Sequence, residues 1–221
     1  MERRLSGQPD LGYLLREYYD LYRGIASGGS KPIRAHQRDV RATIARLVKA
    51  DPPAGGDGGE GTSLPVLAHL RRALNQGRMG RMEGVVMALE TVVPSLRWEQ
   101  GYERMPRRLA RDFAYSEIVG ATGPVRSDAI RLGVVLFAPG CTYPAHAHDH
   151  ITESYVCLSG AISENDQGVY VPGSMIFNPP GTVHRITVSD RDPALLAYAW
   201  TGPPEILSSN RMILGRSSRA G

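Results

Sequence analysis

The residues best suited to chemistry lie between positions 140 and 160, where the chain reads GCTYPAHAHDHITESYVCLSG. The stretch contains His146, His148 and His150, three of the six histidines, together with Glu153. If residues 143–148 form a strand, His146 and His148 point to the same side, because side chains two residues apart share a face. Imidazoles and a carboxylate suit divalent Fe, Mn, Ni or Zn. The stretch therefore predicts a metal site.

Two further ligands complete the predicted site. A tight turn at 149–152 is expected to return Glu153 opposite His148 on the next strand. His184 follows a Pro-Pro-Gly turn that can aim its imidazole inward. The role of His150 is not decided by the sequence. The turn is expected to direct its side chain away from the metal, and the alternative is that it supports one of the ligands from behind. The predicted ligands of one divalent transition metal ion, Fe(II), Zn, Mn or Ni, are His146, His148, Glu153 and His184.

The elements that must position these residues are β-strands. After about residue 111, short apolar runs alternate with Gly, Pro, Asn and Asp, which is typical of a sandwich or barrel. Strands are expected at 113–119, 129–137, 143–148, 153–158, 168–171, 174–178, 183–188 and 194–200. Together they fit a small closed barrel. Residues 205–214 are expected to form a further strand or a covering arm.

The first 110 residues carry a helical pattern, with apolar side chains at the 3.6-residue period. Helices are expected at 11–25, from Pro32 to about 48, at 66–76 with Gly77 as a C-terminal cap, and at 81–93 before Pro94. The glycine-rich segment 54–63 predicts a loop without chemistry, and His36 and His69 are expected to be structural or exposed. We expect a helical region, 1–110, packed on the outside of a barrel, 111–221.

Composition narrows the class of protein. No apolar run approaches the ~18 residues that a membrane span needs, and MERRLSGQPD has no apolar stretch behind its arginines, so a cytoplasmic protein without a secretory signal is expected. Cys141 and Cys157, the only cysteines, are interpreted as reduced thiols. The net charge of +4 comes from scattered arginines, which predicts no nucleic-acid partner and suits a small anionic substrate.

The histidine motifs resemble those of the cupins. The spacing of Gly140, His146, His148, Glu153 and Gly160 matches every fixed position of the first cupin motif. Gly173, the Pro-Pro-Gly at 179–181 and His184 match the second motif, in which Val188 replaces the usual asparagine. The resemblance covers about residues 111–200. It implies a mainly β fold, the cupin double-stranded β-helix or jelly-roll barrel, and leaves the reaction open because cupins include enzymes, storage proteins and sensors.

The tyrosines point to one group of cupins. Tyr143, three residues before His146, and Tyr155, two residues after Glu153, resemble the corresponding tyrosines of the bacterial cupin lyases that cleave dimethylsulfoniopropionate (DMSP) to dimethyl sulfide and acrylate. The long spacing from His148 to Glu153 suggests the L-type subgroup. In that family the tyrosine after the glutamate is the base and the tyrosine before the histidines lies at the substrate. The resemblance therefore implies that Tyr155 is the base and Tyr143 a substrate-site residue.

Elimination from DMSP requires a base and a site for a cation, and tyrosine and tryptophan side chains can provide both. A base must remove a proton from the CH₂ beside the carboxylate, and a nearby cation favours the phenolate form of a tyrosine, whose ordinary pKa is about 10. Aromatic faces attract a sulfonium cation. Tyr143, Tyr198 and Trp200 are the candidates for this contact, with core packing as the alternative for each.

The sequence is also compatible with two other functions. Another cupin metalloenzyme, such as an Fe(II) dioxygenase, could use the same ligands. A ligand sensor or regulator with DNA-binding helices is disfavoured by the lack of a compact basic recognition helix. Pairing of the barrels into a homodimer is expected from the resemblance alone.

Overall fold

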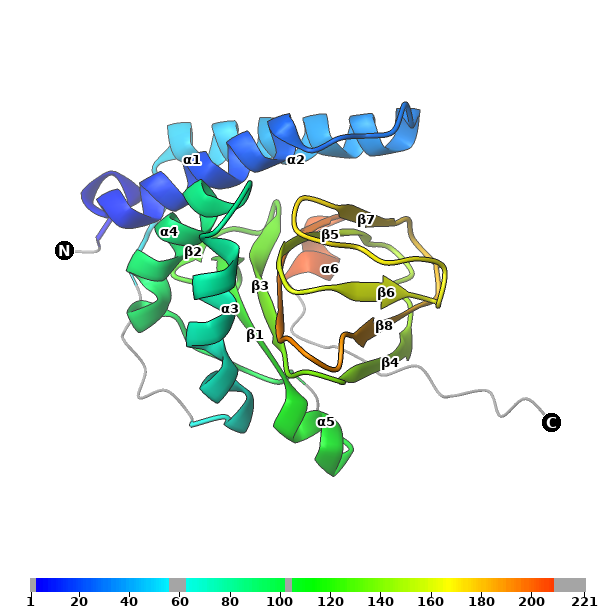
Figure 1. Ribbon diagram of the computed structural model, residues 1–221. Coiled ribbons are helices and arrows are strands. Elements are labelled where there is room, and N and C mark those ends of the chain that lie inside the picture. The colour runs from blue at the N-terminus through cyan, green and yellow to red at the C-terminus, as the bar shows by residue number, and fades with distance from the viewer. Residues whose placement is uncertain (1–2, 56–62, 102–104, 209–221) are drawn as a thin grey trace.

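The computed structural model describes residues 3–55, 63–101 and 105–208. Two sheets face each other as a barrel (Figure 1). The larger sheet has the order β2-β1-β3-β9-β5-β7, and the smaller has the order β4-β8-β6. All neighbouring strands are antiparallel except β1 and β2. The strands are β1 (Phe113–Gly120), β2 (Val125–Arg126), β3 (Arg131–Phe137), β4 (Thr142–His146), β5 (Thr152–Ser159), β6 (Ile162–Glu164), β7 (Met175–Asn178), β8 (His184–Val188) and β9 (Ala194–Thr201).

The mainly β barrel with helices on its outside is confirmed, and the strand expected at 168–171 was wrong. Residues 168–171 form no strand; only Tyr170 makes an isolated bridge, to Ile162. Pro172 directly after them has no N–H to donate to a ladder. The short strands β2 and β6 were not anticipated. The segment expected at 205–214 begins as a helix, α6 (Pro204–Leu207), and its residues from 209 onward lie outside the described part of the chain.

Helices form the N-terminal half, as expected. They are α1 (Pro9–Gly24), α2 (Lys31–Ala50), α3 (Leu70–Gly77), α4 (Glu83–Val92) and α5 (Arg107–Asp112), with 3₁₀ turns η1 (Leu5–Gly7), η2 (Pro65–His69) and η3 (Val93–Ser95). The Ser30 hydroxyl caps the start of α2 by accepting from the Ile33 N–H. Gly77 is the last residue of α3 rather than a residue beyond it, and a Cβ there would lie 2.8 Å from Val86, so glycine allows α3 to approach α4.

The larger sheet is covered on both faces. Figure 1 shows α1 and α2 lying across one end of the barrel and α3 and α4 beside β1 and β3. Along β5, Val156 packs in the core shared with the helices, whereas Tyr155 and Cys157 pack inside the barrel. Because strand side chains alternate between faces, Glu153 points inward with Tyr155, and Ser154 points toward the helices. The helices therefore cover the back of a strand whose front carries candidate site residues.

Among the described residues, no helix has both the length and the apolar character that a membrane crossing requires.

Candidate metal site and adjoining aromatic pocket

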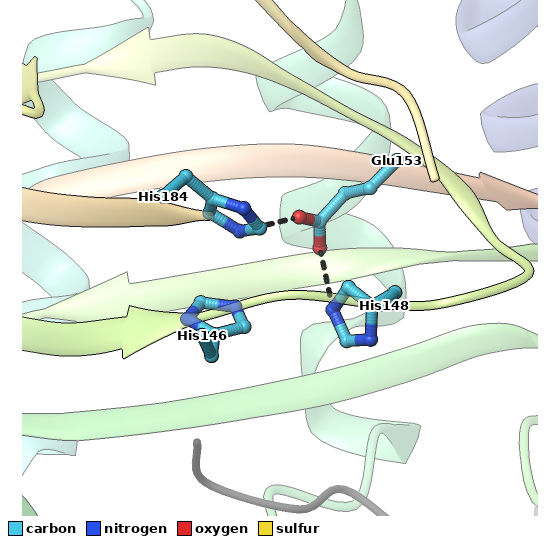
Figure 2. Close-up of side chains that lie close together, drawn as sticks. All are labelled: His146, His148, Glu153 and His184. Atoms are coloured by element: carbon cyan, nitrogen blue, oxygen red, sulfur yellow. Dashed lines mark ion pairs between the residues drawn. The ribbon is translucent and has the colours of Figure 1, made fainter. Parts of the chain in front are cut away.

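The four predicted ligand residues come together inside the barrel, as Figure 2 shows. His146 ends β4, His184 begins β8, and Glu153 is the second residue of β5, while His148 follows β4. One donor atom from each of the four lies within 4.8 Å of the other three. His146 and His184 are register partners of β4 and β8, and their ring centroids are 4.1 Å apart. Both sheets therefore contribute donors to one cluster.

The route by which the chain builds this cluster differs from the expected one. β4 ends at His146, so His148 is not on the same strand. β4 and β5 do not form a hairpin, because β4 pairs with β8 whereas β5 pairs with β7 and β9. Glu153 thus reaches the histidines across the barrel. A register shift between Tyr143 and His146 buries both, although residues three apart in a regular strand face opposite sides.

Backbone carbonyls orient two of the imidazoles. The Nδ1 atom of His146 lies 2.9 Å from the carbonyl oxygen of Pro144, and Nδ1 of His184 lies 3.1 Å from that of Thr182. A carbonyl oxygen only accepts hydrogen bonds, so each Nδ1 carries the proton and donates it. The Nε2 lone pairs are then left for the cluster, which is how metal-binding histidines are commonly held.

Glu153 is the acidic residue of the cluster, and its side chain is fully buried. Its Oε1 accepts a hydrogen bond from the indole Nε1 of Trp200 at 2.6 Å, and its Oε2 lies 2.8 Å from Nε2 of His184. Burial alone would raise the pKa of Glu153, but the close contact with the His184 imidazole and the charges of the neighbouring imidazoles outweigh it and hold the pKa well below its usual range. Glu153 is therefore an ionised carboxylate at neutral pH.

The histidines divide into two groups by protonation. Burial lowers the pKa of His146 to about 4 and also lowers the pKa of His148. Burial opposes protonation of His184 too, but the adjacent Glu153 carboxylate outweighs it and raises the pKa. His146 and His148 are therefore neutral near pH 7, the form in which imidazole binds a metal ion.

The donor set fits a divalent transition metal ion. Within the described residues, Nε2 of His148, Oε2 of Glu153 and Nε2 of His184 are buried atoms without a well-formed hydrogen bond. With Nδ1 of His184 protonated, the 2.8 Å approach of its Nε2 to Glu153 Oε2 brings two lone pairs together unless a proton or cation lies nearby. Three imidazoles and one carboxylate are ligands that Fe(II), Mn, Ni and Zn share.

His150, which the sequence left open, lies outside this donor group. It is exposed to solvent in the segment between β4 and β5. Its backbone carbonyl is close to Gly202, where an added Cβ would lie 2.7 Å from that oxygen. The backbone of His150 therefore packs against the residue that follows β9.

A small aromatic pocket, partly open to solvent, adjoins the cluster. Its walls are Phe113, Tyr115, Arg131, Val135, Phe137, Tyr143, Tyr155, Tyr198 and Trp200. These walls include all four aromatic residues that the sequence singled out. The ring centroid of Tyr143 lies 4.8 Å from that of His146, that of Tyr155 lies 6.4 Å from that of His184, and that of Trp200 lies 4.6 Å from that of His148. Three wall residues of the pocket thus lie beside imidazoles of the donor cluster.

Two of these aromatic residues have environments that limit their chemistry. Burial, followed by the negative charge of Glu117, raises the pKa of Tyr198 well above its ordinary value, so this phenol stays protonated. The Trp200 ring has the guanidinium of Arg131 5.7 Å from its centroid, and its N–H is committed to Glu153. Trp200 therefore holds a candidate ligand as well as lining the pocket.

Several wall residues were missed by sequence reasoning. They are Phe113, Tyr115, Arg131, Val135 and Phe137. The available signal was the period-two alternation of β1 and β3, which puts these residues on one face. The most unusual of them is Arg131, a buried charge that lies 3.4 Å from Glu117 and donates to the carbonyl of Leu207.

Comparison with known proteins assigns the chain to a family. Residues 35–196 match the model of the dimethylsulfoniopropionate lyase family. A Cereibacter sphaeroides protein with the provisional name dimethylsulfoniopropionate lyase DddL is 48% identical over 217 residues, which cover 98% of this chain and 93% of that protein.

Solved structures share the fold. A chain from the crystal structures of the DMSP lyases RdDddP and RnDddQII has a TM-score of 0.62 at 23% identity, covering 89% of this chain and 94% of that one. The DMSP lyase DddQ from Ruegeria pomeroyi has a TM-score of 0.63 at 21% identity, covering 88% and 92%. The family match and the 48% identical relative show that this chain belongs to the dimethylsulfoniopropionate lyase family, whose members are carbon–sulfur lyases.

Proposed function

We propose that this protein is a metal-dependent lyase that eliminates dimethyl sulfide from DMSP, with Tyr155 as the base. The observation that carries the proposal is the joining of a four-donor cluster to an aromatic pocket inside the barrel. Family membership supports the substrate, and the donor set supports the metal dependence.

The substrate's two charged ends suit the two parts of the site. A divalent ion held by His146, His148, Glu153 and His184 supplies a Lewis acid that stabilises the charge developing on the substrate carboxylate. The sulfonium end suits the aromatic walls, since a cation over an aromatic face is stabilised by roughly 0.5–2 kcal/mol per contact. Tyr143, Tyr198 and Trp200 are proposed for these contacts. The Arg131 guanidinium near Trp200 disfavours a second cation there, so the sulfonium is expected nearer Tyr143.

The position of Tyr155 supports its proposed role in proton abstraction. It lies on β5 two residues after Glu153, so both side chains face the cluster. Tyr198, its register partner on β9, has a pKa raised by burial and cannot take this role. In the proposed step the Tyr155 oxygen takes a proton from the CH₂ beside the carboxylate. The C–H electron pair forms the C=C bond of acrylate as the C–S bond breaks, and dimethyl sulfide leaves with the C–S electron pair as a neutral molecule.

The test is dimethyl sulfide release under nitrogen. Protein purified without a histidine tag is loaded with Zn(II), Mn(II), Ni(II) or Fe(II), DMSP is added, and the headspace is analysed by gas chromatography. Equimolar dimethyl sulfide and acrylate, lost after chelation and restored by metal, are expected. A product that requires oxygen would favour a dioxygenase instead, because elimination consumes no oxidant. No dimethyl sulfide with any of the four metals would refute the proposal.

A further inference from the structure

A buried hydrogen-bond network joins the helices to the strand that carries Glu153 and Tyr155. Ser154, between them in β5, points the opposite way and is fully buried. Its Oγ lies 2.8 Å from the Tyr22 hydroxyl of α1 and 2.8 Å from Nε2 of His36 in α2. A buried serine hydroxyl between two helices and a sheet is costly unless it is hydrogen-bonded, and here both helices provide a partner.

The network has a defined direction. Burial lowers the pKa of His36 to about 4 and raises the pKa of Tyr22, so the imidazole is neutral and the phenol keeps its proton. Nδ1 of His36 lies 3.4 Å from Oγ1 of Thr201. If Nδ1 donates to Thr201, Nε2 accepts from Ser154, and Ser154 accepts from Tyr22. The hydrogen bonds then run in one direction, from Tyr22 in α1 to Ser154 in β5, on to His36 in α2 and finally to Thr201 in β9. Each of the three donors gives its proton to the next group.

The network contacts two strands next to the candidate ligand. Thr201 directly follows Trp200 in β9, and Trp200 is the register partner of Glu153. On the inner face of these strands, Trp200 donates to the Glu153 carboxylate. On the outer face, Ser154 and Thr201 are held by the helices. Since neighbouring strand residues share a rigid backbone, a shift of Ser154 displaces Glu153 and Tyr155 with it.

We propose that Tyr22 and His36 are positioning residues for the site, holding β5 so that Glu153 and Tyr155 face the donor cluster. Neither residue lines the pocket, so neither contacts the substrate. The part of the proposal that concerns Tyr155 rests on the proposed function, whereas the part that concerns Glu153 requires only that the cluster binds a divalent ion. The helices thereby act on the chemistry through a specific contact and not only by covering the sheet.

The first test compares two tyrosines of α1. Tyr22→Phe removes the hydroxyl that contacts β5. Tyr18→Phe is the matched control, because Tyr18 is equally buried and donates to the Gly133 carbonyl of β3 at 2.7 Å. Zn(II) affinity is measured by competition with a chromophoric chelator, and kcat and KM by dimethyl sulfide release. We expect Tyr22→Phe to lower Zn(II) affinity and kcat by about 10-fold each, with KM little changed.

Rescue at position 36 gives a second test. His36→Gln can place an amide near the position of Nε2 and keep the contact with Ser154, whereas His36→Leu cannot. We expect His36→Gln to keep wild-type Zn(II) affinity within about threefold and His36→Leu to lose about 10-fold. The absorption bands of the Co(II)-substituted protein, which report ligand geometry, should change for His36→Leu and not for His36→Gln.

The outcomes separate the two proposals. If the wild type binds Zn(II) but releases no dimethyl sulfide, the proposed function fails, and the affinity and Co(II) measurements still test the network. Equal Zn(II) affinities for Tyr22→Phe and Tyr18→Phe, together with equal Co(II) spectra for His36→Leu and His36→Gln, would overturn the positioning role.

Discussion

Replacing Trp200 by phenylalanine isolates the hydrogen bond that holds the candidate metal ligand Glu153. The indole N–H of Trp200 donates to Glu153 Oε1 at 2.6 Å, and the carboxylate is fully buried. Phenylalanine keeps an aromatic ring beside His148, whose centroid is 4.6 Å from that of Trp200, but has no N–H. The change therefore removes one donor from a buried charge while keeping most of the packing.

The expected size of the effect follows from the nature of this bond. A hydrogen bond to a charged group contributes about 1.5–3 kcal/mol. Since about 1.4 kcal/mol corresponds to a tenfold change in an equilibrium constant, metal affinity should fall about 10- to 100-fold. Loss of the partner of a metal ligand typically has an effect in the same range. The freed carboxylate can rotate or attract a proton, and either change competes with binding of the ion.

The assay is a Zn(II) competition titration against a chromophoric chelator at pH 7. Trp98→Phe is the matched control, because Trp98 is the only other tryptophan and is buried in the core shared with the helices. That variant should lose stability but bind Zn(II) as the wild type does. If Trp200→Phe binds Zn(II) within twofold of the wild type, the indole does not hold the ligand and the reasoning is wrong.

Three further predictions concern the base, the pH dependence and the packing of the barrel. Tyr155→Phe should retain its metal and lose about 10²- to 10⁴-fold in kcat, measured by metal analysis and dimethyl sulfide release; near-wild-type kcat would remove Tyr155 from the base role. Because the pKa of His36 is about 4 in the fold and about 6.5 when unfolded, the unfolded state binds more protons as the pH falls through this window. The folded protein therefore loses about 2 kcal/mol of stability from this group between pH 7 and pH 5, and His36→Gln should flatten the pH dependence of urea unfolding accordingly. In Gly133→Ala, the new Cβ would overlap the backbone of β1 and lie 2.5 Å from the Tyr198 hydroxyl. Urea titration should show a loss of about 1–3 kcal/mol, and an unchanged midpoint would contradict the close packing.

Much of the fold could be predicted from periodicity, because each pattern is local. Alternating residues place Glu153 with Tyr155, and Tyr198 with Trp200, on shared faces of two strands. The strand predicted at 168–171 was wrong because an apolar run does not reveal whether a neighbouring strand is available to pair with it. The path of the chain from β4 to β5 was also beyond local reasoning, since strand pairing between two sheets is decided by the whole barrel.

The sequence by itself determined which side chains could hold a metal ion, because histidine and glutamate identities and their motif spacing are written in the chain. Only the tertiary structure decided how those side chains are held. The partner of Glu153 is an indole 47 residues away, and the partner of Ser154 is an imidazole 118 residues away. Neither spacing has a period that a sequence pattern could carry. Both contacts exist because the barrel closes on one side of β5 and the helices pack on the other.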